Sequence, residues 1–427
     1  MPTIAFHTLG CKLNFAESSD LLRRFVAEGY KEVSFKEKAD VYVINTCTVT
    51  SIAEKKCRNA VRQAHTLNPQ GLIAVIGCFA QVNAKEIAKI EGVNLILGND
   101  NKHLLLDKVK QWNKTLELQN FVRDISRLHS FYSSVSFSDR TRGFLKVQDG
   151  CDYFCTYCEI PFARGRSRSC TIEQALQDAR LLANENKKEV VLTGVNIGDF
   201  GKGRKDNFLD LIKELDKIEE IKRYRISSIE PDLLTEEIID FCASSRSFMP
   251  HFHIPLQAGS DKVLRLMKRN YDTLLFKNKV MHIKEKMPNS FIACDVMTGF
   301  NGEGEQEFEE TLFLLRSLPI AFIHVFPYSE RPDAWAKNLS EKVPVRKRKE
   351  RSELLQQLAI EKKHNFYLKN IGQKTNVLWE ESQKDGYMYG FTDNYIRVRT
   401  AFDIDKVNTI ESVILEKLST DKEFFEI

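Results

Sequence analysis

The chain of 427 residues has no uninterrupted apolar run that approaches the roughly 20 residues of a membrane-spanning helix. Its first residues, Met1–Phe6, lack the basic stretch followed by an apolar stretch that marks a secretory signal. Internal repeats and low-complexity tracts are absent as well, and a hydrophobic fraction of 42% is ordinary for a globular protein. These absences exclude fibrous and disordered classes. They predict a cytoplasmic protein with no membrane partner.

The chain also lacks a strong charge bias, since its formal net charge is only +4. A surplus this small is common in proteins that never bind nucleic acid, so the total charge does not identify a partner. The length is more informative, because single hydrophobic cores stop growing at roughly 250 to 300 residues. Two or three domains are therefore expected.

Ten cysteines are present, and in a reducing cytosol clustered cysteines indicate metal binding or catalysis more often than disulfides. One set of three lies in a single short loop: Cys151, Cys155 and Cys158. A second set is scattered through the first fifth of the chain: Cys11, Cys47 and Cys78. The other four form no set and are expected to pack in the core: Cys57, Cys170, Cys242 and Cys294.

The first third of the chain alternates short apolar runs with stretches of helical spacing. The predicted strands cover residues 4–8, 41–45 and 72–76. This pattern predicts a doubly wound, mostly parallel sheet in an N-terminal domain of residues 1–115. Each cysteine of the scattered set follows a predicted strand end by one to three residues. Ligands bind beyond the carboxyl ends of such strands, so the three thiolates are expected to meet in one crevice, with three unrelated buried cysteines as the alternative.

A polar segment, residues 112–140, separates this domain from a second alternating region, residues 140–370. Six strands are predicted there: 144–148, 189–193, 224–228, 251–255, 291–297 and 321–326. Six βα units predict a partial (β/α)6 barrel, because a full barrel needs two more. The first of these strands leads directly into the compact cysteine loop. That loop is therefore expected at the mouth of the barrel, where such folds carry out chemistry.

The last segment, Ile371–Ile427, changes to short alternating runs with glycine and asparagine, which predicts a small C-terminal β-barrel. A basic run opens the preceding helix, and two arginines lie on a predicted strand. These residues are candidate RNA contacts: Arg346, Lys347, Arg348, Arg397 and Arg399. The alternative for the basic run is a solvated helix face.

Three cysteines separated by three and two residues supply three thiolates to one centre. A structural zinc or a fully ligated iron-sulfur cluster takes four protein ligands, yet no fourth cysteine or close histidine follows Cys158. An open position belongs to a catalytic centre, and a 4Fe-4S cluster held by three thiolates leaves one iron free to chelate a small molecule. Zinc remains the alternative.

The cysteine spacing, with Tyr157 beside Cys158, resembles the signature of radical S-adenosylmethionine enzymes. The segments around both cysteine sets resemble the methylthiotransferase family: residues 8–14, 45–49, 76–78 and 147–151. Members of that family combine an N-terminal cluster domain, a radical barrel and a C-terminal TRAM domain, and the resemblance covers essentially the whole chain. It implies two 4Fe-4S clusters, an auxiliary one on the scattered set and a radical one on the loop, with no catalytic residues beyond their ligands.

Within the family, residues 10–14, 160–166 and 191–200 are most similar to the branch that acts on N6-threonylcarbamoyladenosine in tRNA. The resemblance implies a transferase that forms the 2-methylthio derivative of this base, 3′ to the anticodon, with two S-adenosylmethionine molecules per product. It also implies cofactor contacts near the barrel strand ends: Gly194, Asn196, Ser228, Glu230, Gln257 and Asp295. For each of these residues a structural role is the alternative.

The resemblance implies three partners, namely a tRNA anticodon loop, a low-potential electron donor and a sulfur source. The alternative substrates within the family are isopentenyladenosine in tRNA and an aspartate of a ribosomal protein. Outside the enzyme class, the alternatives are an iron-sulfur protein that binds RNA or senses redox state, and a zinc-stabilised RNA-binding protein.

Overall fold

The computed structural model describes residues 1–48, 51–112, 117–136, 141–331 and 334–427. The chain folds into two compact units. The N-terminal unit comprises residues 1–136, 146–154 and 158–170, and the C-terminal unit comprises residues 137–145, 155–157 and 171–427. The compact cysteine loop is divided between them, because Cys151 and Cys158 belong to the N-terminal unit and Cys155 to the C-terminal unit.

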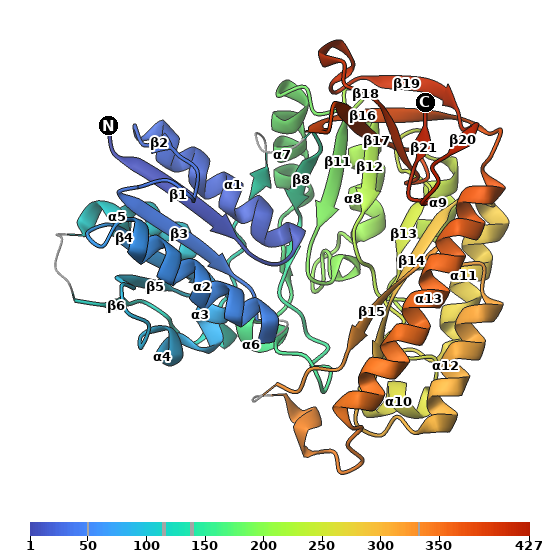
Figure 1. Cartoon of the computed structure of the whole chain (residues 1–427), viewed down its shortest axis with the longest axis horizontal. Coiled ribbons are helices and arrows are strands. Elements are labelled where there is room, and N and C mark those ends of the chain that lie inside the picture. Colours follow the sequence, from blue (N-terminus) through green and yellow to red (C-terminus); the bar gives the residue numbers. More distant parts are fainter. Residues whose placement is uncertain (49–50, 113–116, 137–140, 332–333) are drawn as a thin grey trace. The chain divides into compact units, whose positions relative to one another are not determined.

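The N-terminal unit is built on a parallel sheet of six strands (Figure 1). In order across the sheet these are β2 (Lys31–Glu32), β1 (Thr3–Thr8), β3 (Val41–Thr46), β4 (Leu72–Gly77), β5 (Leu95–Leu97) and β6 (Gln119–Asn120). Every residue of β3 and β4 is buried, as central strands covered on both faces should be. The predicted parallel sheet is confirmed, with three further short strands that the sequence pattern did not indicate, of which β2 and β6 are the edges.

Helices cover both faces of this sheet: α1 (Lys12–Ala27), α2 (Ser51–Leu67), α3 (Cys78–Val82), α4 (Ala84–Ile87) and α5 (Leu105–Gln111). Alternate strand residues point to opposite faces. On one face Tyr42 and Ile44 pack with Val61 of α2, and on the other Val43 packs with Phe25 of α1. The unit also contains α6 (Ile160–Arg164) and the antiparallel pair β9 (Gln148–Asp149) and β10 (Arg168–Ser169).

The C-terminal unit carries the six predicted barrel strands: β8 (Gly143–Lys146), β11 (Glu189–Thr193), β12 (Arg223–Ile226), β13 (His251–His253), β14 (Phe291–Thr298) and β15 (Phe322–Pro327). The strands β8, β11 and β12 form one sheet and β13, β14 and β15 another. Parallel bridges from Tyr224 to Phe248 and from Ser228 to His253 join the two sheets. The strands therefore form one open, curved wall, and the predicted partial barrel is confirmed.

The helices of this unit lie on the outside of the barrel wall (Figure 1): α7 (Ile172–Asn184), α8 (Phe208–Asp216), α9 (Glu236–Ser244), α10 (Asp261–Leu266), α11 (Thr273–Lys286), α12 (Glu305–Ser317) and α13 (Val345–Lys369). No helix in the described parts of the chain is long and apolar enough to cross a membrane.

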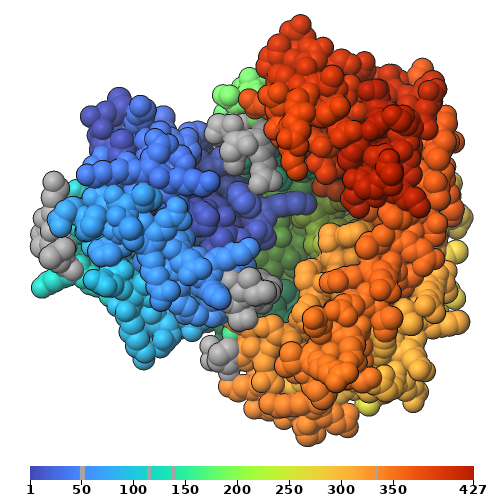
Figure 2. Space-filling view, in the orientation of Figure 1, coloured from blue at the N-terminus to red at the C-terminus, as the bar shows by residue number. Residues whose placement is uncertain are grey.

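The C-terminal segment forms a curled sheet of six strands, in the order β19 (Ile410–Ile414), β16 (Lys374–Lys384), β17 (Tyr387–Thr392), β18 (Arg397–Ala401), β21 (Phe425–Glu426) and β20 (Lys417–Leu418). This architecture matches the expected small β-barrel domain. Its core is shared with the barrel, because Trp379 and Val398 pack in one cluster with Phe291 of β14 and Phe366 of α13. In Figure 2 the sheet, in red, accordingly meets the end of α13, in orange.

Two buried arginines of β12 reinforce this connection. Arg223 donates to the backbone carbonyls of Phe391 and Asn376 at 3.0 and 2.9 Å. Arg225 donates to the carbonyl of Thr392 at 2.8 Å and to Glu189 at 2.8 Å. The sheet therefore completes hydrogen bonds that begin inside the barrel. The barrel and the C-terminal sheet therefore share hydrogen bonds as well as a core.

The four cysteines outside the two sets lie in the core, each at most 4% exposed: Cys57, Cys170, Cys242 and Cys294. Their expected packing role is confirmed. Burial raises the pKa of the Cys57 thiol to about 12, which keeps it protonated and unreactive.

Candidate functional site

The first candidate site lies where three neighbouring strands of the N-terminal sheet end. Cys11 follows β1, Cys47 follows β3, and Cys78 begins α3 directly after β4. Because β1, β3 and β4 are adjacent and parallel, their carboxyl ends share one sheet edge. The structure thus brings the scattered cysteines to one edge, with Cys47 and Cys78 buried and Cys11 exposed.

Two glycines allow the close approach of these cysteine-bearing turns. Gly10 has φ +104°, and a Cβ atom there would lie 2.8 Å from the Cβ of Cys47. Gly77 has φ +97°, and its Cβ would lie 2.8 Å from the carbonyl oxygen of Thr46. The positive φ angle and the close neighbouring atoms both exclude a side chain at these positions, so each turn depends on glycine.

Two asparagines hold the same turns in place. The Asn14 side chain donates to the carbonyls of Leu9 and Thr46 at 2.8 and 3.0 Å, which ties the turn of Cys11 to that of Cys47. The Asn99 Nδ2 lies 3.5 Å from the Cys78 sulfur and donates to the carbonyl of Ala163 at 2.8 Å. Such outer contacts orient metal ligands. Asn14 lies in a motif singled out from the sequence, whereas nothing in the sequence pointed to Asn99.

A network of buried charges adjoins two of the thiols, those of Cys11 and Cys78. Two carboxylates contact four cations: Glu17, Asp149, Lys102, Lys146, Arg164 and Arg168. All six side chains are nearly inaccessible to solvent. The cations exceed the carboxylates by two, and a buried positive excess requires an anionic neighbour.

Arg164 is the member of this network nearest the thiols. Its Nη1 lies 2.9 Å from Asp149 and 3.1 Å from Glu17, and only 1% of its side chain is exposed. Burial by itself would lower the pKa of Arg164, but Cys78, Glu17, Asp149 and Cys11 raise it well above its usual value. A permanent positive charge therefore stands beside Cys78 and Cys11.

The donor set and its surroundings fit an iron-sulfur cluster. Three thiolates supply the negative charge that the buried positive excess requires, and Arg164 faces them. A structural zinc takes four protein ligands, whereas three thiolates leave one position of a 4Fe-4S cluster open.

The compact cysteine loop shows contacts that suit cluster ligands. In the N-terminal unit the Cys151 sulfur accepts from the backbone N–H of Tyr153 at 3.5 Å, and the Cys158 sulfur accepts from that of Ile160 at 3.4 Å. Hydrogen bonds of this kind stabilise thiolates and tune cluster potentials.

In the C-terminal unit, Arg269 contacts the third cysteine of the loop. Its Nη1 lies 2.9 Å from the Cys155 sulfur and 3.3 Å from the Tyr157 hydroxyl. Its Nη2 pairs with Glu230, and its Nε donates to the Tyr271 hydroxyl at 3.1 Å. Burial raises the pKa of the Cys155 thiol and the Arg269 charge opposes this, so the guanidinium favours the thiolate. No sequence motif marked Arg269.

Five of the six residues expected to contact the cofactor follow strands of the barrel in turn. Gly194 and Asn196 come directly after β11, and Ser228 and Glu230 come after β12. Gln257 follows β13 with φ +65°, a left-handed conformation that is uncommon for a non-glycine residue.

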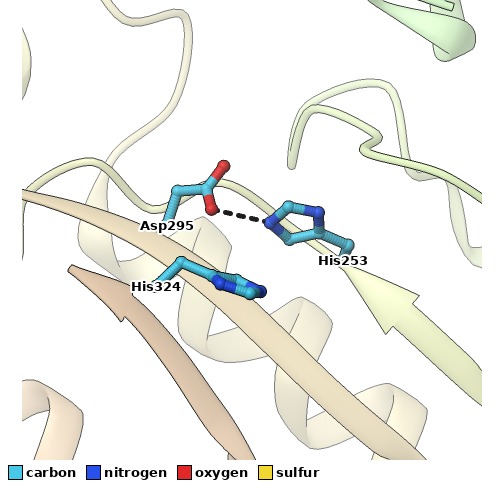
Figure 3. Close-up of side chains that lie close together, drawn as sticks. All are labelled: His253, Asp295 and His324. Carbon is cyan, nitrogen blue, oxygen red and sulfur yellow. Dashed lines mark hydrogen bonds and ion pairs between the residues drawn. The ribbon is translucent and has the colours of Figure 1, made fainter. Parts of the chain in front are cut away.

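The last of the six, Asp295, lies within β14. It accepts a hydrogen bond from His253 at 2.8 Å, and His324 of β15 lies beside both (Figure 3). His324 was not singled out from the sequence.

Glu230 has the strongest perturbation among these residues. Burial raises its pKa to about 7, against the opposing charge of Arg269, and Asp232, Asp295 and Asp199 raise it further. A carboxyl group that titrates near neutral pH in a polar chamber is typical of a functional site.

The structure separates the five candidate RNA contacts. Tyr367, at the far end of α13, accepts from the backbone N–H of Arg397, whereas Arg346 lies some 21 residues earlier, roughly 32 Å along the helix. Arg346 and Lys347 are exposed and pair with glutamates. Arg348 instead donates to the carbonyls of Val343 and Tyr328 at 2.9 Å each, which is a structural role.

On β18, Arg397 stacks over Tyr389, with its guanidinium carbon 4.0 Å from the ring centre. Arg399 stacks over Tyr387 and Phe424 at 4.2 Å from each ring centre, and it pairs with Glu426 at 2.7 Å. This arginine and aromatic surface has the composition of single-stranded RNA-binding sites.

Comparison with protein families gives two matches. Residues 3–98 match the family described as uncharacterized protein family UPF0004, and residues 145–315 match the radical SAM superfamily. The first match contains the scattered cysteines and the second contains the compact cysteine loop.

Curated relatives extend over nearly the whole chain. The chain is 39% identical to the threonylcarbamoyladenosine tRNA methylthiotransferase MtaB of Aquifex aeolicus, over 93% of this chain and 96% of the relative. It is 30% identical to a tRNA-2-methylthio-N(6)-dimethylallyladenosine synthase of Methylacidiphilum infernorum, over 90% of this chain and 86% of that relative.

Among solved structures, the chain is similar to the radical S-adenosylmethionine methyltransferase TsrM of Kitasatospora setae, determined with cobalamin and a 4Fe-4S cluster bound. The TM-score is 0.56 at 11% identity, and the match covers 76% of this chain and 75% of the other. At this identity the likeness concerns the fold alone.

Proposed function

Since the chain belongs to the methylthiotransferase family of radical S-adenosylmethionine enzymes, we propose that it converts N6-threonylcarbamoyladenosine in tRNA to the 2-methylthio derivative. The observation that carries this proposal is the likeness, along nearly the whole of both chains, to a relative named for that reaction. The two cysteine sets and their surroundings support the same chemistry.

The proposal includes two 4Fe-4S clusters. Cys11, Cys47 and Cys78 would hold the auxiliary cluster, and Cys151, Cys155 and Cys158 the radical cluster. When bound, these clusters and two molecules of S-adenosylmethionine per product supply a 5′-deoxyadenosyl radical and a methylthio unit. The protein's part is to place positive charge beside the ligand sulfurs. Arg164 does this beside Cys11 and Cys78, and Arg269 does it beside Cys155, with its Nη1 2.9 Å from the sulfur.

The strand ends of the barrel would position the cofactor. Gly194 lets a ligand approach the backbone after β11, and Asn196, Ser228 and Gln257 offer polar side chains after successive strands. Glu230 is held by Arg269, which also contacts Cys155, so one guanidinium connects a cluster ligand with the proposed cofactor chamber.

The tRNA would be held by the arginine and aromatic surface of β17 and β18. The target base lies in a single-stranded loop, where recognition by stacking is usual. Arg397 and Arg399 are already stacked on aromatic rings, so their planes are ordered before RNA arrives. A low-potential electron donor and a sulfur source complete the proposed partners, and the proposed location is the cytoplasm.

The test is mass spectrometry of nucleosides from the tRNA of a strain that lacks this protein. The expected result is loss of 2-methylthio-N6-threonylcarbamoyladenosine with accumulation of its unmethylthiolated precursor. The purified, reconstituted protein should restore the methylthio group on that tRNA. Unchanged levels of the modified nucleoside would refute the proposal.

Isopentenyl-type adenosine is a second candidate substrate, because a relative at 30% identity is named for that reaction. The same nucleoside profile decides between the two, since each modified base has its own mass. A redox sensor or a zinc protein that binds RNA would form no 5′-deoxyadenosine when reduced in the presence of S-adenosylmethionine.

A further inference from the structure

Three polar side chains on neighbouring strands converge in the C-terminal unit (Figure 3). His253 ends β13, Asp295 lies in β14, and His324 lies in β15. The two imidazole ring centres are 5.2 Å apart. Within the described ranges, no other three His, Cys, Asp or Glu side chains bring their ligand atoms within 4.8 Å of one another.

The strand register places this trio next to the candidate cofactor contacts. Asp295 is the direct partner of His324 across β14 and β15. The backbone N–H of Gln257 donates to the carbonyl of Asp295 at 2.8 Å, and Ser228 forms a parallel bridge with His253. The trio is thus joined to the strand ends that carry Glu230, whose partner Arg269 contacts Cys155.

An apolar pair continues the same surface. Met297 and Phe326 are direct partners two residues beyond Asp295 and His324. Side chains two residues apart on a strand share a face, so this pair extends the face of the trio. Phe326 is 47% exposed. Hydrogen-bonding groups next to an exposed aromatic ring are what proteins offer to an unstacked nucleobase.

We propose that His253, Asp295 and His324 form the subsite for the hydrogen-bonding N6 substituent of the target adenosine. This inference rests on the proposed function and deepens it. A threonylcarbamoyl group carries N–H and O–H donors, a urea carbonyl and a carboxylate, whereas a dimethylallyl group carries only carbon and hydrogen. Asp295 accepts from donors, and imidazole N–H groups donate to the carbonyl or the carboxylate. A dimethylallyl group would form none of these hydrogen bonds, so the subsite favours the threonylcarbamoyl group.

A divalent cation is the other ligand that two histidines and a carboxylate can hold. The direct contact between Nε2 of His253 and Oδ1 of Asp295, at 2.8 Å, favours the substrate. A hydrogen atom between these two atoms occupies the space that an ion bound to both would need. In this arrangement the carboxylate orients the imidazole and fixes its tautomer.

The test compares His324→Phe with a matched control. The substitution keeps a ring but removes both nitrogens, and the exposed position of His324 on β15 keeps the cost to folding small. His282→Phe is the control, because Nε2 of His282 also pairs with an aspartate, Asp240, at 3.0 Å. That pair joins two helices, α11 and α9, outside the chamber.

The substrates are three anticodon stem-loop RNAs that differ only in the N6 group of the target adenosine: threonylcarbamoyl, dimethylallyl or hydrogen. Affinity is measured without S-adenosylmethionine, and kcat/KM and 5′-deoxyadenosine are measured with the reconstituted enzyme. His324→Phe should lower affinity and kcat/KM for the threonylcarbamoyl RNA by about 10- to 100-fold. Affinity for the other two RNAs and 5′-deoxyadenosine formed without RNA should not change. His282→Phe should match the wild type throughout.

Three results would overturn the subsite: an unchanged preference for the threonylcarbamoyl RNA in His324→Phe, loss of 5′-deoxyadenosine formation without RNA, or a stoichiometric non-cluster metal that the substitution removes. Failure of the proposed function looks different. A wild-type protein that methylthiolates no threonylcarbamoyl RNA would overturn that function, and the subsite with it, whatever the variant does.

Discussion

At the scale of single residues, two buried arginines are surrounded by anionic groups that their neighbours in sequence do not reveal. Arg164 stands among Glu17, Asp149 and the N-terminal thiols, and Arg269 stands between Cys155 and Glu230. Both are nearly inaccessible to solvent. A buried guanidinium is stable only where anions surround it, so each arginine marks a point at which negative charge gathers.

Replacing Arg164 tests this argument in the N-terminal unit. Arg164→Met leaves Glu17 and Asp149 short of a partner in a buried site, which should cost about 3–5 kcal/mol of folding free energy. The thermal midpoint of the reduced, metal-free protein should fall by several degrees, and Arg164→Lys should recover part of the loss. Arg127→Met is the control, since Arg127 is 90% exposed and should contribute little. Equal midpoints for the two methionine variants would contradict the role of the network.

The raised pKa of Glu230 predicts that the free energy of unfolding depends on pH. Burial raises its pKa to about 7, above the roughly 4.3 of an unfolded chain, so the folded protein binds more protons between these values. The free energy of unfolding should therefore fall by up to about 3 kcal/mol as the pH rises from about 4 to beyond 7. Glu230→Gln should remove this part of the slope. The measurement is the thermal midpoint of the wild type and of the variant in the same series of buffers. If both midpoints changed with pH in the same way, the predicted role of Glu230 would be refuted.

At the scale of elements, the C-terminal sheet and the barrel stabilise each other. Trp379 of β16 is fully buried in a cluster that contains Phe291 of β14 and Phe366 of α13. Arg223 and Arg225 of β12 depend on carbonyls of the sheet for their hydrogen bonds. Removing residues 371–427 would expose this cluster and leave both arginines without those acceptors, so a truncated barrel should be poorly soluble.

A point substitution tests the shared core without truncation. Trp379→Ala should destabilise the protein by about 3–5 kcal/mol, and the sheet and the barrel strands should unfold in one transition. Tyr387→Ala, on the neighbouring β17, should cost less than about 1 kcal/mol, because Tyr387 is 39% exposed. Thermal unfolding followed by limited proteolysis distinguishes the cases. A separate early transition confined to residues 371–427 would show an independently folding sheet.

At the scale of the whole molecule, we propose that the two cysteine sets serve separate steps of the reaction. The scattered set lies at one edge of the N-terminal parallel sheet. Cys151 and Cys158 belong to the same unit but lie in a separate loop, and Arg269 and the candidate cofactor contacts belong to the C-terminal unit. Loss of the scattered set should therefore spare the radical step.

The triple variant Cys11→Ala, Cys47→Ala and Cys78→Ala tests this separation. It should keep about half of the iron, release 5′-deoxyadenosine under reducing conditions, and form no methylthio product. The matching triple variant at Cys151, Cys155 and Cys158 should release no 5′-deoxyadenosine. Iron analysis and nucleoside mass spectrometry provide the readouts. Full iron content with normal methylthiolation would show that the N-terminal thiols bind no cluster, and general misfolding would indicate a core role instead.

The sequence by itself determined the features that depend on local periodicity and spacing. Apolar runs of strand length gave the parallel sheet and the partial barrel, because burial on both faces imposes such runs. The position of Cys11, Cys47 and Cys78 after strand ends sufficed to predict their common edge, since neighbouring parallel strands end together.

Only the tertiary structure decided which distant side chains meet. Arg164, Arg269 and His324 carry no local signal, because their partners are brought to them by other strands and helices. The length of α13 separates Arg346 from Arg397, although both belong to the C-terminal third of the chain. The shared core around Trp379 likewise depends on contacts between residues far apart in sequence. Periodicity reports which face of an element is buried, but not which element covers it.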